Sequence, residues 1–367
     1  MATTSSTQYV VAVVISRQPV PVQQWQGGLT RTITSTLMQA LAATDLPTVR
    51  FLDLDTTQKF DENADARVLE ITLPLSSSTP HLTITQCTAL TLEPTILALR
   101  QTHNLNIAIQ PSSLYHAHRA PGLIVFDMDS TLIQQEVIDE LARTIGLYEQ
   151  VAAITEAAMR GEAPYTDFSA SLRARVALLK GVETSIWQKL RDEIIRFTPG
   201  ARELVRVLKM MGWKTAVLSG GFTPLALWVK EELGLDYAEA NFLVENDGVL
   251  TGELVDGMAI VDATRKRVLL QALAEKEGVP LERTMAVGDG SNDLLMMHAS
   301  GLGVAFNAKP KVQAQAPATL NADGLLDVLY YMGYTKLEVE ALLAKEMRWE
   351  RGQFVLRKPT VATTAIR

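Results

Sequence analysis

The sequence has very little cysteine, since Cys87 is the single one among 367 residues. An intrachain disulfide is therefore excluded, and so is a zinc site built from several cysteines. One free cysteine fits a reducing compartment. We expect the chain to be cytoplasmic.

The sequence has no early hydrophobic run that could cross a membrane. The longest apolar stretch near the N-terminus, Tyr9 to Ile15, is far shorter than the roughly 20 residues of a transmembrane helix. No Lys or Arg precedes it, whereas a signal peptide begins with basic residues. We interpret this stretch as a β-strand and expect no membrane partner.

An excess of positive charge is also missing. Lys and Arg total 34 and Asp and Glu total 41, which gives a formal net charge of −7. Nucleic acid is therefore not expected as a partner, because phosphate backbones favour basic surfaces. A small phosphate-bearing substrate remains compatible, since it needs only a few local charges. The length favours two domains.

The first third of the chain alternates between strand-like and helix-like patterns. The expected order is strand Gln8–Ile15, helix Gly28–Ala43, strands Thr48–Leu54 and Val68–Leu75, helix Leu92–Arg100 and strand Leu105–Ile109. This βαββαβ order is ferredoxin-like and resembles the regulatory amino-acid-binding ACT domains. We expect an ACT-like domain over residues 1–110 and a linker over residues 111–121, which are rich in Pro and Ser.

A different pattern begins at Gly122. Continuous apolar runs at 123–126, 215–218 and 284–287 alternate with helical segments. Such runs are typical of strands buried on both faces of a parallel sheet, so a doubly wound α/β domain is predicted over residues 122–334. A helical block after its first strand predicts a cap at about residues 134–198.

Two smaller features complete this organisation. The stretch Glu245 to Gly252, with Asn-Asp-Gly inside it, predicts a β-hairpin. Residues 335–367 form a C-terminal extension, helical at first and then polar, to which the sequence assigns no role.

Acidic and small residues follow three of the predicted strands. Asp127 and Asp129 follow the first strand, Ser219-Gly220-Gly221 follows the second, and Gly288 to Asp293 follows the third. In an open α/β sheet, ligands bind beyond the carboxyl ends of the strands. Two close carboxylates repel each other, and a divalent cation relieves that repulsion. The glycines expose backbone N–H groups to an anion at the start of a helix.

These strand ends, with Lys266 between the second and third, resemble the four motifs of the haloacid dehalogenase-like hydrolases. Further blocks narrow the resemblance to the phosphoserine phosphatases and cover about residues 122 to 333. The matching segments are Asp127-Met128-Asp129-Ser130-Thr131, Ser171-Leu172-Arg173-Ala174-Arg175-Val176, Ser219-Gly220-Gly221-Phe222, Gly288-Asp289-Gly290-Ser291-Asn292-Asp293 and Ala308-Lys309-Pro310, together with Glu136.

The resemblance implies a catalytic role for several residues. Asp127 would be the nucleophile that becomes phosphorylated, and Asp129 the general acid and then the general base. Lys266, with Ser219 and Gly220, would hold the phosphoryl oxygens.

The resemblance also implies a metal and a set of substrate contacts. Mg²⁺ would be bound by Asp127, the backbone carbonyl of Asp129 and Asp289, with Asp293 in a supporting role. The remaining substrate-binding residues would be Glu136 for the ammonium, Arg175 for the carboxylate, Met159 and Phe168 as apolar residues of the cap, and Asn292 near the phosphate.

The expected activity is hydrolysis of O-phospho-L-serine to L-serine and phosphate, the last step of serine biosynthesis. Two alternatives remain open: another small-molecule phosphatase or phosphomutase of the same superfamily, and a non-catalytic amino-acid sensor. A homodimer is expected by analogy alone. Because all expected site residues follow Gly122, we expect a fragment from about Arg119 to Gly333 to keep substantial activity.

Overall fold

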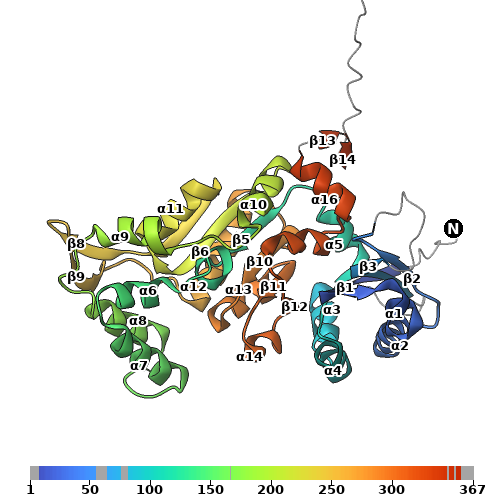
Figure 1. Ribbon diagram of the computed structural model, residues 1–367, viewed down its shortest axis with the longest axis horizontal. Helices are drawn as coiled ribbons and strands as arrows, with labels where there is room; N and C mark the ends of the chain where they lie inside the picture. The colour runs from blue at the N-terminus through green and yellow to red at the C-terminus, as the bar shows by residue number, and fades with distance from the viewer. Residues whose placement is uncertain are drawn as a thin grey trace, which may run out of the picture.

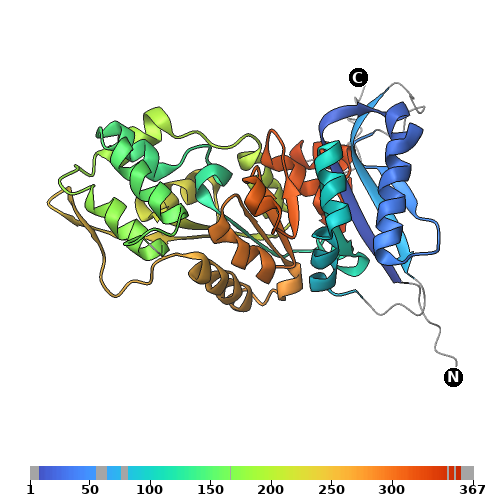
Figure 2. The same ribbon diagram turned by 90° about the horizontal axis from the view of Figure 1, so that it is seen from below.

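A computed structural model describes residues 8–54, 64–75, 82–165, 167–344, 347–350 and 353–356 of the chain. Two larger sheets organise these residues, a four-stranded sheet near the N-terminus and a six-stranded sheet after it. The N-terminal sheet lies at one end of the molecule and a group of cap helices lies at the other (Figure 1, Figure 2). Within the described ranges, no helix is both long and apolar enough to span a bilayer.

The N-terminal sheet is antiparallel, with the strand order β2-β3-β1-β4. Its strands are β1 (Gln8–Pro21), β2 (Thr48–Phe51), β3 (Asp65–Leu75) and β4 (Leu105–Pro111). The helices between them are α1 (Val22–Gln24), η1 (Trp25–Leu29), α2 (Thr30–Leu41), α3 (Ile84–Thr91) and α4 (Pro94–His103). The four predicted strands are present, and two helices stand between β3 and β4 where one was predicted. The ACT-like assignment stays a prediction.

Strand β1 is buried on both faces, whereas an antiparallel sheet often has one face in water. Val10 and Val14 pack with the helices of the N-terminal sheet. Val11, Val13 and Ile15 alternate with them and belong to the large core that contains the six-stranded sheet. The two sheets are therefore joined by a continuous apolar core.

The six-stranded sheet is parallel throughout, and it confirms the predicted doubly wound α/β domain. Its order is β12-β11-β10-β5-β6-β7. The strands are β5 (Leu123–Phe126), β6 (Lys214–Phe222), β7 (Tyr237–Asn241), β10 (Thr284–Gly288), β11 (Leu302–Phe306) and β12 (Ala318–Leu320). The two outer strands, β7 and β12, were not predicted from the sequence.

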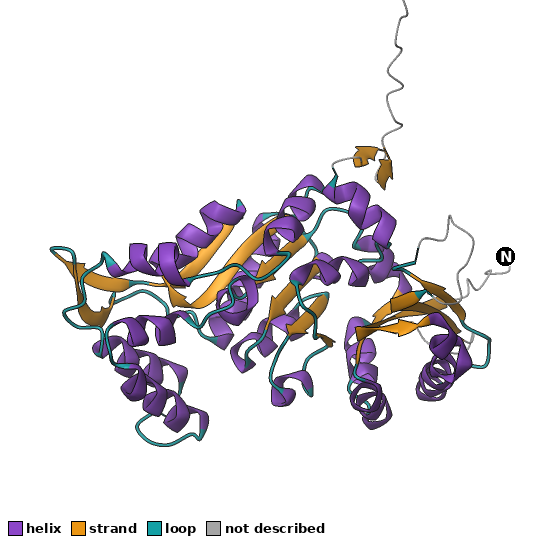
Figure 3. Cartoon of the chain, in the orientation of Figure 1, coloured by secondary structure: helices purple, strands orange, loops and turns teal. Residues whose placement is uncertain are grey.

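Helices cover both faces of this sheet (Figure 3). They are α10 (Ala201–Met210) and α11 (Thr223–Leu233) on one face, and α12 (Ala263–Lys276) and α13 (Leu294–Ala299) on the other. Successive residues of β5 point to opposite faces. Phe126 packs in the cluster that contains Leu204 of α10, and Val125 packs in the cluster that contains Leu270 of α12.

A cap is inserted between β5 and α10. Its elements are α6 (Val137–Thr144), α7 (Tyr148–Met159), α8 (Phe168–Ala177), α9 (Ile186–Lys189) and η3 (Leu190–Ile194). The two connections to the cap pair with each other at Ile133 and Phe197.

The predicted β-hairpin is confirmed. It consists of β8 (Leu243–Asn246) and β9 (Val249–Leu254). Asp247 and Gly248 have φ values of 48° and 76°, as a tight two-residue turn requires. Val249 also pairs with Glu183, so the hairpin supports the cap.

The predicted linker, residues 111–121, contains a short helix that packs between the two sheets. This helix is α5 (Ser112–Ala117). Its Tyr115 is buried and donates a hydrogen bond to the Glu70 carboxylate of β3. The segment therefore forms part of the packed junction between the two sheets.

Polar contacts reinforce the same junction. The Arg67 guanidinium of β3 lies 2.6 Å from the Asp327 carboxylate. Asn106 of β4 accepts a 2.7 Å hydrogen bond from the backbone N–H of Asn321, beside β12. The remaining elements are η4 (Leu281–Arg283), η5 (Ser291–Asp293), α14 (Pro310–Gln313), η6 (Leu325–Asp327), α15 (Val328–Tyr331), α16 (Lys336–Leu343), β13 (Met347–Glu350) and β14 (Gln353–Leu356).

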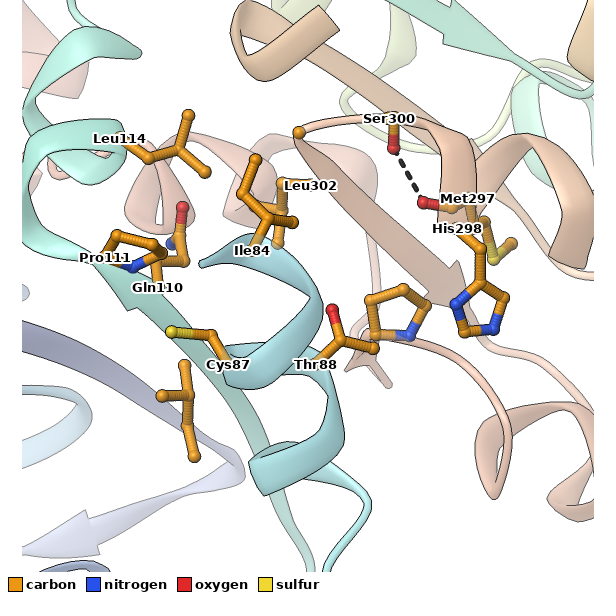
Figure 4. Close-up of a pocket in the computed structure, with 13 residues that line it drawn as sticks. Ile84, Cys87, Thr88, Gln110, Pro111, Leu114, Met297, His298, Ser300 and Leu302 are labelled. Atoms are coloured by element: carbon orange, nitrogen blue, oxygen red, sulfur yellow. Dashed lines mark hydrogen bonds between the residues drawn. The ribbon is translucent and has the colours of Figure 1, made fainter. Parts of the chain in front are cut away.

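A small pocket lies at this junction, between α3 and β4 on one side and α13 and β11 on the other (Figure 4). Its lining residues are Ile84, Cys87, Thr88, Ile109, Gln110, Pro111, Leu114, Met297, His298, Ser300, Gly301, Leu302 and Pro317. None of the expected site residues is among them.

Candidate active site

Asp127 stands directly after β5, at the centre of the six-stranded sheet. Its backbone N–H donates a 2.8 Å hydrogen bond to the carbonyl of Val287 in β10, which fixes the residue at the carboxyl edge. Its carboxylate accepts a 2.7 Å hydrogen bond from the N–H of Met128. The side chain is almost entirely buried, so few water molecules compete for it.

Lys266 connects Asp127 to the acidic loop after β10. Its Nζ lies 2.8 Å from Oδ1 of Asp127 and 2.7 Å from Oδ1 of Asp293. Burial alone would lower the pKa of Lys266, but attraction to the two carboxylates outweighs that effect and raises the pKa above its ordinary value. The lysine is therefore a fixed cation beside Asp127.

Asp127, Asp289 and Asp293 form an acidic cluster, with one carboxylate oxygen of each within 4.8 Å of the others. Burial, together with repulsion from Asp127 and Asp293, raises the pKa of the Asp289 carboxyl to about 8. A divalent cation would relieve this repulsion, and its preference for oxygen ligands matches the residues present. The cluster therefore fits a hard metal ion.

Asp293 already has hydrogen-bond donors on both carboxylate oxygens. Oδ1 is bound by Lys266, and Oδ2 accepts a 2.9 Å hydrogen bond from the N–H of Gly290. It is fully buried, and burial and the nearby Asp127 raise its pKa to about 7. This arrangement suits a residue that orients Lys266 and leaves Asp127 and Asp289 free to bind a metal.

Asp129 lies two residues after Asp127, within η2 (Met128–Leu132). One carboxylate oxygen accepts a 3.3 Å hydrogen bond from the N–H of Val137, and the other is buried with no partner among the described residues. Burial and repulsion from Glu136 and Asp127 raise the pKa of Asp129 well above its ordinary value. This shift favours the protonated form of the carboxyl, which suits a group that donates a proton.

Ser219–Gly221 form an irregular loop within the last part of strand β6, where the pairing with β7 is interrupted between Leu218 and Phe222. This loop lies beside the carboxylates. The buried Ser219 hydroxyl oxygen accepts a 2.9 Å hydrogen bond from the N–H of Gly221. A Cβ on Gly221 would lie 3.5 Å from a carboxylate oxygen of Asp129, and one on Gly220 would lie 3.1 Å from the ring of Phe168. The cap thus reaches the loop through Phe168, the first residue of α8.

Glu136 and Arg175 face the carboxylates from the cap side. The Glu136 carboxylate accepts a 2.6 Å hydrogen bond from Ser130, and burial raises its pKa although that hydrogen bond opposes the change. Burial lowers the pKa of Arg175, while the charges of Asp139, Glu136 and Asp129 act against this.

Among the residues that the structure describes, Arg175 has no carboxylate partner of its own. Its Nε donates a 3.3 Å hydrogen bond to the carbonyl of Ser171, one turn earlier in α8. It takes part in no ion pair with another described residue. A half-buried guanidinium without an anion is suited to bind a carboxylate that arrives with a ligand.

Two expected site residues are less closely tied to this group. Asn292 lies in η5 within the acidic loop, with its amide oxygen against Gly290. Met159 ends α7, and its side chain lies outside the part of the chain that the structure describes.

Asn241 is a site residue that the sequence reading missed. It ends β7 and is buried below the loop Ser219–Gly221, where its amide donates to the carbonyls of Gly220 and Gly221. The only signal in the sequence is a polar residue at the carboxyl end of a strand, and this strand was not predicted.

Comparisons with known proteins agree with this geometry. The family model of haloacid dehalogenase-like hydrolases matches residues 124–298. A phosphoserine phosphatase of Streptomyces coelicolor is 50% identical over 65% of this chain, and the match spans 56% of that protein, so little more than half of its length. A phosphoserine phosphatase of Idiomarina loihiensis is 52% identical over 57% of this chain and 92% of its own length.

A solved structure extends the likeness to most of the chain. A haloacid dehalogenase family hydrolase of Salmonella enterica serovar Typhi is 30% identical, with a TM-score of 0.67 over 88% of this chain and 98% of its own. The motifs, the parallel sheet with its inserted cap and these relatives all indicate the same family. The chain belongs to the phosphoserine phosphatases of the haloacid dehalogenase-like hydrolases, which are phosphoric monoester hydrolases.

Proposed function

We propose that this chain hydrolyses O-phospho-L-serine to L-serine and phosphate in two steps, through an aspartyl phosphate on Asp127. One observation carries the proposal. The buried carboxylate–lysine pair of Asp127 and Lys266 lies beside Glu136 and Arg175, and Arg175 forms no ion pair with another described residue. The first pair suits phosphoryl transfer, and the second matches the ammonium and carboxylate of an amino acid.

In the first step, a carboxylate oxygen of Asp127 attacks phosphorus, and the bond from phosphorus to the serine oxygen breaks. Asp129 gives its proton to that oxygen, so that serine leaves as a neutral alcohol. The raised pKa of Asp129 supports this role, because burial and the nearby charges of Glu136 and Asp127 favour the protonated carboxyl. Lys266 and Ser219 stabilise the charge on the phosphoryl oxygens.

In the second step, water attacks the phosphorus of the aspartyl phosphate. Asp129, now ionised, accepts the proton of the water, and the bond from phosphorus to the Asp127 oxygen breaks. Phosphate is released, and both aspartates return to their starting states. The first-formed serine needs to leave, or at least to move aside, before water takes its place.

Mg²⁺ is the proposed cofactor. Asp127, the backbone carbonyl of Asp129 and Asp289 would bind it, and Asp293 would support them through Lys266. When bound, the ion supplies positive charge that offsets the repulsion between a phosphate dianion and the carboxylates.

The cap would supply substrate recognition. Glu136 would bind the ammonium, Arg175 the carboxylate, and Phe168 would cover the loop at Gly220. Asn292 and Met159 complete the proposed contacts. We also propose a cytoplasmic location and a regulatory, ACT-like role for residues 1–110; the homodimer stays a prediction.

Phosphate release from a panel of esters tests the proposal. The purified chain with Mg²⁺ should hydrolyse phosphoserine with a higher kcat/KM than phosphothreonine, glycerol phosphate or a simple aryl phosphate. Equal rates on all esters would contradict the substrate. No release from any ester, by a folded protein that binds Mg²⁺, would contradict the reaction.

A further inference from the structure

Asn241 connects the loop Ser219–Gly221 to the segment that precedes Lys266. It is only 3% exposed, although its side chain is polar. Its Nδ2 donates hydrogen bonds of 2.9 Å to the carbonyl of Gly220 and 3.2 Å to that of Gly221. Its Oδ1 accepts a 2.9 Å hydrogen bond from the N–H of Val261. The amide therefore has hydrogen-bond partners at both ends, and none of these partners is a carboxylate of the acidic cluster.

The bond to Gly220 fixes the orientation of the Ser219 hydroxyl. The carbonyl of Gly220 and the N–H of Gly221 belong to one planar peptide, so holding the first also holds the second. That N–H donates to the Ser219 hydroxyl oxygen at 2.9 Å. A hydroxyl that accepts there keeps its own proton free to donate in another direction. The phosphoryl group is the acceptor proposed above.

The hydrogen bond to Val261 connects Asn241 to the segment before Lys266, which is the second proposed contact to the phosphoryl group. Asp262, the next residue, caps α12 by accepting a 2.7 Å hydrogen bond from the N–H of Arg265. Its carbonyl accepts a 2.9 Å hydrogen bond from the N–H of Lys266 in the first turn of the helix. The position of Lys266 thus depends on a segment that Asn241 anchors to the loop.

We propose that Asn241 is a positioning residue that sets the distance between the Ser219 hydroxyl and the Lys266 ammonium, and so determines how tightly the site holds a phosphoryl group. The inference rests on the proposed phosphatase reaction. Asn241 itself would not touch the substrate, because its polar atoms are used by Gly220, Gly221 and Val261.

The variant Asn241→Asp tests this role with little change in size. Aspartate keeps an acceptor for the N–H of Val261 but loses both donors to the glycine carbonyls. Asn246→Asp introduces the same change at an exposed position of the neighbouring hairpin and is the matched control. Both should be measured with phosphoserine and with an aryl phosphate, and by calorimetric titration of inorganic phosphate in Mg²⁺.

For Asn241→Asp we expect kcat/KM to fall about 10- to 100-fold, and by the same factor for both substrates, because the loss concerns the phosphoryl group that they share. The Kd of inorganic phosphate should rise at least about tenfold by the same argument. Inhibition by L-serine, which lacks the phosphoryl group, should stay unchanged. Asn246→Asp should behave as the wild type.

Unchanged phosphate binding in a folded variant would overturn the proposal, and so would a fall confined to phosphoserine. If Asn241→Asp does not fold, the same measurements should be made on Asn241→Ser. This variant also removes the amide, and its smaller side chain leaves room for water. If the wild type does not hydrolyse phosphoserine, only the proposed substrate is contradicted. Hydrolysis of the aryl phosphate and the phosphate titration would still test the role of Asn241.

Discussion

The Lys266 ammonium lies 2.8 Å from a carboxylate oxygen of Asp127, although α12 and β5 are far apart in the sequence. The same ammonium also binds Asp293, and all three side chains are buried. Removing one partner would leave an uncompensated charge in the interior, which is costly. The ion pair with Lys266 therefore holds the Asp127 carboxylate in place at the edge of the sheet.

Replacement of Asp127 by asparagine should abolish turnover and preserve phosphoserine binding. An amide is not a nucleophile toward phosphorus, whereas Lys266, Ser219 and Arg175 remain available to the ligand. Calorimetric titration with phosphoserine and a single-turnover assay of phosphate release measure the two properties. Asp256→Asn, at an exposed position, should keep full activity. Substantial phosphate release by Asp127→Asn would rule out Asp127 as the nucleophile.

Stability of the metal-free protein should fall as the pH rises toward 8. The pKa of Asp289 is raised to about 8, so the folded state keeps a proton that the unfolded chain releases near pH 4. Mg²⁺ binds the ionised form and should therefore raise Tm more at pH 8 than at pH 6. Thermal unfolding in EDTA and in Mg²⁺ at both pH values tests this. An equal shift of Tm at the two pH values, or an undiminished shift in Asp289→Asn, would contradict it.

His118 should make the protein sensitive to acid. It is wholly buried and bound to Gln110 at 3.0 Å, and burial lowers its pKa to about 4. The unfolded chain takes up a proton near pH 6.5, so stability is unaffected above that pH and is lost as the pH falls toward 4. A difference of about 2.5 pKa units corresponds to about 3 kcal/mol.

The variant His118→Gln isolates this effect, because glutamine keeps a donor for Gln110 but does not titrate. Urea unfolding between pH 7 and pH 4 should give a shallower pH dependence for the variant than for the wild type. His103→Gln, at an exposed position, serves as the control and should change nothing. Identical pH profiles for wild type and His118→Gln would show that His118 is not the responsible group.

The sequence predicted the central strands of the six-stranded sheet better than its outer strands. Buried apolar runs identify β5, β6 and β10, and the acids that follow them lie together because parallel strands end at one edge. Strand β7 carries polar residues and β12 has only three residues, so neither has a recognisable pattern. Asn241 is the last residue of β7, so it was not predicted as a site residue either.

The junction between the sheets was predicted least well. Pro111 and the serines after it favoured a linker, but Tyr115 packs against both sheets through contacts remote in sequence. A local pattern cannot reveal that Val11 and Val13 pack against another domain, since the same alternation suits any half-buried strand. The expectation of an independent fragment needs revision for this reason.

A fragment from Arg119 to Gly333 should be unstable or self-associating, because it exposes the apolar surface that β1 covers in the full chain. Val13→Asp in the full chain should have a similar effect, since a charge would be buried at the junction. Tyr9→Asp, on the same strand but 45% exposed, should be tolerated. Tm and light scattering measure both properties. A monomeric fragment as stable as the full chain would contradict this view of the junction.

The central claim is that Arg175 selects phosphoserine for attack by Asp127, and Arg175→Ala tests it most directly. The measurement is the ratio of kcat/KM for phosphoserine to that for an aryl phosphate, in the wild type, in Arg175→Ala and in Arg173→Ala, which alters an exposed arginine on the same helix. Loss of a charged contact to the substrate carboxylate should lower the ratio about 30- to 1000-fold in Arg175→Ala. The ratio should remain unchanged in Arg173→Ala. A ratio that does not move in Arg175→Ala would contradict the assignment of phosphoserine as the substrate.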